Sequence, residues 1–179
     1  MKYNLIRSQP IYQGRAFTVR QDDLLLPDGQ STQLDIVDHP GAVVLVPVDE
    51  DGNLWLVRQY RHAAGEEMLE LPAGTLEPGE DIESCAFREL REETGMSAGR
   101  IRKIGEFYMA PGYSTEFLHI FLATDLKPDP LPRDEDEFIV VERLTTGQAF
   151  ILATQGQFRD AKTLAALLLA QPYLTGSSK

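Results

Sequence analysis

The sequence predicts a protein of mixed strands and helices, because groups of strand-like segments are followed by helical ones along a chain with enough apolar residues for one substantial core. It has 179 residues, of which 42% are hydrophobic, and one main domain is the default at this length. The first forty residues differ in character from the rest. We therefore expect an N-terminal β-rich segment, 1–40, followed by a main domain, 41–175.

The N-terminal segment has two strand-like stretches, at about 11–26 and 33–37, joined by the Pro-Asp-Gly turn at 27–29. Pro, Asp and Gly each favour a reversal of the chain. A β unit of this size is too small to be stable alone. It therefore needs a partner surface.

The main domain begins with two strands, 42–48 and 54–60, of which the first is almost entirely apolar and is expected to be central. Further strands are expected at 101–108, 117–123 and 138–144, and helices at 146–154 and 160–170. The last helix is apolar enough to pack on the sheet.

A helix of about fourteen residues is predicted between the strand at 54–60 and the strand at 101–108. Asp81 or Glu80 opens it with negative charge near its positive end, and Gly95 closes it. At about 100° per residue, Glu89 and Glu93 continue an apolar stripe that would otherwise face the core. The helix therefore directs two carboxylates inward.

Glu92 lies beside Glu89 and Glu93, so three carboxylates converge where like charges repel. A hard cation such as Mg²⁺ relieves that repulsion and prefers oxygen ligands. The alternative is a solvated, salt-bridged helix face, as many charge runs are. Gly74, Glu80 and Gly95 lie at fixed offsets from these three acids and favour the metal site over that alternative.

Charge and composition restrict the partners. The formal net charge of −11 repels nucleic-acid backbones and anionic membranes, so neither is an expected partner. The single cysteine, Cys85, precludes an internal disulfide and is expected to be a packing residue. The start of the chain lacks a signal-peptide pattern and no segment is a membrane span, so a cytoplasmic protein is expected.

The carboxylate helix and its approach resemble the Nudix hydrolase family at every fixed position of that family's pattern. The matching residues are Gly74, Glu80, Arg88, Glu89, Leu90, Glu92, Glu93, Gly95 and Met96. The resemblance implies an α/β/α sandwich around a mixed sheet over about 42–171. It also implies hydrolysis of a nucleoside diphosphate linked to another group. The implied ligands of Mg²⁺, or of Mn²⁺, are Glu89, Glu92, Glu93 and the carbonyl of Ala73, with Glu80 as an outer contributor and Arg88 orienting a glutamate.

Two features outside that helix resemble the ADP-ribose pyrophosphatase branch. They are Leu-Glu-Leu-Pro-Ala-Gly at 69–74 and Pro111, sixteen residues beyond Gly95. Within the branch, the acidic loop at 132–139 supplies a catalytic base, here Glu135, with Glu137 nearby, alongside Glu92 and Arg88 as catalytic residues. Arg61 matches a substrate-contacting arginine, and Arg58, Pro111 and Glu137 are further candidates for substrate contact. The N-terminal segment resembles one exchanged between the subunits of a homodimer.

Substrate choice stays open. Where the branch often has serine and aspartate, this chain has Ala110 and Thr115. The layout also resembles broader nucleoside diphosphate sugar hydrolases acting on ADP-glucose or GDP-mannose. A non-catalytic nucleotide-sugar sensor is a further alternative, although a sensor has no need of the full glutamate set. Cleavage of damaged nucleoside triphosphates is disfavoured by Pro111 and the N-terminal segment.

Overall fold

The computed structural model describes residues 2–132 and 138–174. The chain forms two compact units, one of residues 1–41 with 107–118 and one of residues 42–106 with 119–179. The loop at 107–118 thus groups with the N-terminal unit. That 1–40 and 41–175 are separate domains stays a prediction.

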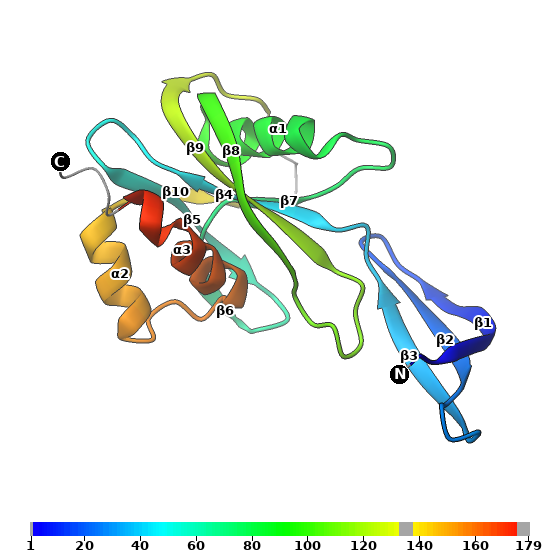
Figure 1. The fold of residues 1–179 in the computed structure, drawn as a ribbon. Helices are drawn as coiled ribbons and strands as arrows, with labels where there is room; N and C mark the ends of the chain where they lie inside the picture. Colours follow the sequence, from blue (N-terminus) through cyan, green and yellow to red (C-terminus); the bar gives the residue numbers. More distant parts are fainter. Residues whose placement is uncertain (1, 133–137, 175–179) are drawn as a thin grey trace. The chain divides into compact units, whose positions relative to one another are not determined.

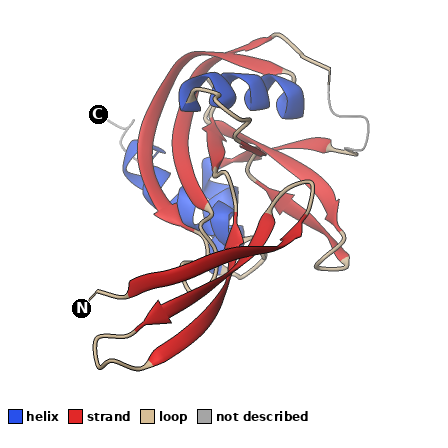
Figure 2. Ribbon diagram, turned by 90° about the vertical axis from the view of Figure 1, so that its right-hand side faces the viewer, coloured by secondary structure: helices blue, strands red, loops and turns tan. Residues whose placement is uncertain are grey.

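The N-terminal unit contains strands and loops only (Figure 2). β1 (Asn4–Gln13), β2 (Thr18–Leu25) and β3 (Ser31–Asp38) form an antiparallel sheet in that order. The β2–β3 turn falls where predicted, with Gly29 at a φ of 87° that glycine adopts readily. The expected strand over 11–26 is wrong, because the chain reverses at 14–17. β1 lacks a clear period-two pattern because nearly all its residues are exposed.

The main unit contains two sheets, ordered β10-β5-β6 and β7-β4-β9-β8. The short strands β6 and β7 were not predicted, and β8 and β9 extend beyond their predicted ranges. The bounds are β4 (Ala42–Pro47), β5 (Asn53–Arg61), β6 (Glu66–Glu70), β7 (Ala73–Thr75), β8 (Met96–Tyr108), β9 (Phe117–Pro128) and β10 (Val140–Thr145).

The helices are α1 (Ile82–Thr94), α2 (Thr146–Thr154) and α3 (Ala161–Leu174), and α1 and α3 both pack on β4 (Figure 1). Every residue of β4 is buried. Val43 and Leu45 join a core with Ala86 and Leu90 of α1. Because successive strand residues point to opposite faces, β4 is covered on both. This confirms the predicted α/β/α arrangement. No helix within the described residues is long and apolar enough to cross a membrane.

Candidate active site

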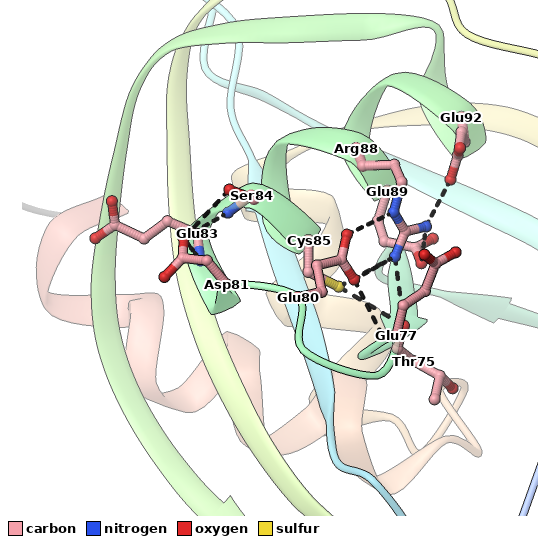
Figure 3. Close-up of polar contacts among 10 residues, drawn as sticks. All are labelled: Thr75, Glu77, Glu80, Asp81, Glu83, Ser84, Cys85, Arg88, Glu89 and Glu92. Atoms are coloured by element: carbon pink, nitrogen blue, oxygen red, sulfur yellow. Dashed lines mark hydrogen bonds and ion pairs between the residues drawn. The ribbon is translucent and has the colours of Figure 1, made fainter.

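Capping interactions at both ends fix the register of α1. Asp81 accepts hydrogen bonds through Oδ2 from the N–H groups of Glu83 and Ser84, each at 3.1 Å (Figure 3). Gly95, with a φ of 75°, ends the helix. In this register Glu89 and Glu93, one turn apart, both lie on the buried face of the helix.

Arg88 lies at the centre of the carboxylate cluster. Its Nε and Nη2 donate to the two oxygens of Glu80 at 2.8 and 2.9 Å, and its Nη1 donates to Glu89 at 2.7 Å and Glu92 at 2.9 Å (Figure 3). The hydrogen bonds with Glu80 are the main reason that the pKa of Arg88 is raised and that of Glu80 is lowered to about 2. One permanent cation therefore holds three carboxylates together.

The segment at β7 approaches the helix closely enough to require glycine. The N–H of Ala73 donates to Glu93 Oε2 at 2.9 Å. A Cβ on Gly74 would lie 1.7 Å from Cδ of Glu89 and 1.8 Å from its Oε1. The φ of Gly74 is outside the left-handed region. Gly74 is therefore needed because the Glu89 carboxylate occupies the space that a Cβ would take.

The carboxylates of α1 fit a hard divalent cation. Their donors are all oxygen, Glu93 is oriented by the N–H of Ala73, and the Glu89 carboxylate lies in the space that a side chain at position 74 would take. Among residues 2–132 and 138–174, no three acidic, histidine or cysteine side chains already stand as a ligand set. Arg88 lies between Glu89 and Glu92 and donates a hydrogen bond to each of them.

A second charged cluster lies beside the first. Glu70, with a side chain only 1% exposed, accepts from Arg61 Nε at 2.8 Å and Nη2 at 2.7 Å, and it also accepts from Lys162. Burial alone would raise the pKa of Glu70, but Arg61 and Lys162 outweigh it and the pKa is lowered. Glu93 acts electrostatically on Arg61, which ties this cluster to the carboxylate helix.

The structure does not bring Arg58 to this cluster. Arg58 lies three residues before Arg61 in a regularly paired strand, so the two side chains leave β5 on opposite faces. Arg58 is instead paired with Glu142 of β10. Its predicted substrate contact stays a prediction, which the geometry favours less than that of Arg61.

The remaining predicted residues lie elsewhere. Pro111 is in the connection between β8 and β9, within the N-terminal unit. Glu135 and Glu137 lie outside the described residues. Cys85 is fully buried in the α1 core, and burial is the main reason that its pKa is raised to about 12, which suits the predicted packing role.

Comparison with known proteins identifies the family. The sequence model of the NUDIX domain matches residues 38–167. The chain belongs to the Nudix family. The resemblance predicted from the sequence is thus confirmed, and the chain is a Nudix hydrolase. Nudix hydrolases generally depend on a divalent metal, which agrees with the oxygen donors of α1.

Relatives of this Nudix hydrolase include two named pyrophosphatases and a solved ADP compounds hydrolase. It is 38% identical to ADP-ribose pyrophosphatase of Bacillus subtilis (strain 168) over 168 residues, covering 93% of this chain and 91% of that protein. It is 34% identical to GDP-mannose pyrophosphatase of Yersinia pestis (strain Pestoides F) over 170 residues, covering 87% and 84%. The crystal structure of an ADP compounds hydrolase matches with a TM-score of 0.87 at 28% identity, covering 99% of this chain and 97% of that one.

Proposed function

We propose that this Nudix hydrolase splits ADP-ribose into AMP and ribose 5-phosphate, with Mg²⁺ as its metal and Mn²⁺ as a possible substitute. The likeness to the Bacillus subtilis ADP-ribose pyrophosphatase, over 93% of the chain, carries the choice of substrate. The site itself supports diphosphate chemistry, since its carboxylates suit a metal and Arg61 suits a phosphate.

Each residue of the site has a role in this proposal. Glu89, Glu92 and Glu93 would hold the metal with the carbonyl of Ala73, and Glu80 would contribute through Arg88. When bound, the metal would neutralise phosphoryl charge and lower the pKa of a nearby water. In the overall hydrolysis, the oxygen of water ends on one phosphorus and the bridging oxygen leaves with the other phosphate. A base takes one proton of that water, and the sequence predicts this base to be Glu135.

Arg61 is the proposed anchor for the diphosphate, with Pro111 and Glu137 as further predicted contacts. Within the described residues, Glu70 accepts two of the five N–H donors of Arg61. The other edge of the guanidinium remains for phosphate oxygens, and the side chain is 41% exposed. An arginine fixed on one edge and open on the other is well suited to binding a diphosphate.

A broader nucleoside diphosphate sugar hydrolase is the second candidate. The likeness to the Yersinia pestis GDP-mannose pyrophosphatase favours it. Ala110 and Thr115, which depart from the usual pattern of the ADP-ribose branch, favour it too. A broader hydrolase would use the same metal site and Arg61 on the diphosphate, but its substrate site would select the sugar and the base less strictly.

Turnover of a substrate panel tests both readings. Release of phosphate-containing products is measured from ADP-ribose, ADP-glucose, UDP-glucose, GDP-mannose and a nucleoside triphosphate, with Mg²⁺ and with a chelator. We expect ADP-ribose to lead by at least about tenfold, and Glu93→Gln to lose activity by orders of magnitude without unfolding. Similar rates on several sugars would support the broader enzyme. No metal-dependent turnover on any of them would contradict both readings and support a sensor.

A homodimer is the proposed assembly, formed through the N-terminal sheet. Within residues 2–40, Asp22 is the only buried residue. A three-stranded sheet without an apolar core is not stable by itself, and its exposed apolar side chains offer a surface to a second copy. They are Tyr3, Leu5, Ile6, Ile11, Tyr12, Phe17 and Leu34. Light scattering should give about twice the 20.0 kDa of one chain, and a monomer mass would contradict the dimer.

A further inference from the structure

The start of α3 carries three polar side chains in a connected group. Asp160 directly precedes the helix and accepts from Thr163 N at 3.0 Å, as a capping residue does. Its Oδ2 also lies 2.9 Å from Lys162 Nζ. Thr163 Oγ1 donates to the same carboxylate at 2.6 Å. The cap of α3 therefore fixes both Lys162 and Thr163.

Thr163 ties this helix start to the segment that follows β6. Thr163 is fully buried, and its Oγ1 accepts from the N–H of Leu71 at 2.8 Å. Pro72 O accepts from Leu45 N at 2.8 Å. The backbone on the C-terminal side of Glu70 is thereby held to α3 and to β4. The side chain of Glu70 therefore extends from a backbone that is held in place by these hydrogen bonds.

Lys162 supplies the second cation that Glu70 requires. Its side chain is only 15% exposed and donates to Glu70 Oε2, the oxygen that also accepts from Arg61 Nη2. A carboxylate with 1% exposure is stable only when paired and hydrogen-bonded. Arg61 and Lys162 share that task, so the position of Glu70 between them sets the plane of the Arg61 guanidinium.

We propose that Lys162 is a positioning residue of the active site, which acts through Glu70 to hold Arg61 in the orientation that receives the diphosphate. This rests on the proposed function in one respect, the binding of phosphate by Arg61. The contact joins residues 92 positions apart in the sequence and makes α3 part of the substrate site. Without Lys162, Arg61 is the cation that remains to Glu70 among residues 2–132 and 138–174, and the guanidinium is drawn toward the buried carboxylate.

The test compares Lys162→Met with a matched control, Arg159→Met. Arg159 is also a cation at the start of α3 and also pairs with β6, but its partner is Glu66 at 3.2 Å and not Glu70. We measure kcat and KM for ADP-ribose with Mg²⁺, and thermal unfolding. Lys162→Met should raise KM about tenfold while kcat changes less than about threefold, since a misplaced binding group weakens recognition. Arg159→Met should match the wild type within about twofold.

A double-mutant cycle separates positioning from general stability. If Lys162 acts through Arg61, Lys162→Met should add little to the rise in KM already caused by Arg61→Gln. A purely structural role would instead give equal, additive effects in both backgrounds. Additive effects would overturn the proposal. Equal KM values for Lys162→Met and Arg159→Met would overturn it too.

Binding of inorganic pyrophosphate in chelator provides a readout that needs no turnover. Calorimetry should show weaker pyrophosphate binding to Lys162→Met than to Arg159→Met. A wild type that binds pyrophosphate but cleaves no sugar diphosphate would refute the proposed function and still test Lys162. If pyrophosphate binding is unaffected by Lys162→Met and by Arg61→Gln alike, the inference fails, whatever the enzyme cleaves.

Discussion

Replacing Gly74 by alanine should remove activity while leaving the fold in place. The added Cβ would lie 1.7 Å from Cδ, 1.8 Å from Oε1 and 2.2 Å from Oε2 of Glu89. Ordinary carbon contacts are about 3.5–4.0 Å, so the carboxyl group must move by about 2 Å. A displacement of about 1 Å can cost about 100-fold in rate. We therefore expect a loss of at least about 100-fold in kcat and weaker binding of Mg²⁺.

Gly147→Ala is the matched control for Gly74→Ala. A Cβ on Gly147 meets nothing within 4 Å, and the residue lies in the first turn of α2. Alanine there should leave activity unchanged and stabilise slightly, by about 0.5–1 kcal/mol. Because the end of the Glu89 side chain can swing away, Gly74→Ala should lose no more than about 1–3 kcal/mol of stability. Kinetics, calorimetric Mg²⁺ titration and thermal unfolding measure these changes. Activity of Gly74→Ala within threefold of Gly147→Ala would refute the reasoning.

Three further predictions concern charged residues. Arg61→Gln should lower kcat/KM by at least about tenfold, because a charged hydrogen bond to phosphate is lost, whereas Arg58→Gln should change it less than threefold. Equal losses in a kinetic comparison would place Arg58 in the site. The pKa of Glu70 is lowered in the folded chain, so its ionised carboxylate adds to the unfolding free energy above the ordinary carboxyl pKa of about 4.3. This contribution is lost as the pH falls through the folded pKa. The gap in unfolding free energy between wild type and Glu70→Gln should therefore shrink from pH 6 to pH 3, and a constant gap would contradict this. Arg88→Gln in chelator should lose about 3 kcal/mol, or roughly 6–12 °C in Tm, and Mg²⁺ should restore much of it. An equal loss with and without Mg²⁺ would refute this role of Arg88.

The parts of the site that could be predicted from the sequence are those built from local signals. Asp81 and Gly95 mark the ends of α1, and the spacing of Glu89 and Glu93 sets their shared face. Each of these signals acts within one or two turns of the chain, so the helix and its acidic face follow directly. Gly74 was singled out from the sequence by the family pattern, but its structural reason, the space that the Glu89 carboxylate occupies, appears only when β7 lies against the helix.

The parts that could not be predicted depend on contacts between distant segments. Glu70 belongs to β6, a strand of five residues that gave no clear pattern, and its partner Lys162 lies on the last helix. No local rule predicts that Arg58 pairs with Glu142 whereas Arg61 pairs with Glu70. Their separation required the register of β5 with β6 and β10. Likewise β1 was not predicted as a separate strand, because nearly all of its residues are exposed and give no pattern of buried positions.

Arg88 explains how so many acids can lie together before a metal arrives. Three carboxylates share one guanidinium that is 24% exposed, so the folded chain does not carry the full repulsion of an empty acidic site. If Glu89 and Glu92 hold the metal as proposed, the same contact limits metal affinity, since a cation must draw both carboxylates away from Arg88. Glu80 takes the larger share of the guanidinium through two hydrogen bonds. It can therefore retain Arg88 when the other two turn to a metal. The pairing of Arg88 with Glu80 therefore offsets the repulsion among these carboxylates and, in the proposed site, would leave Glu89 and Glu92 available to a metal.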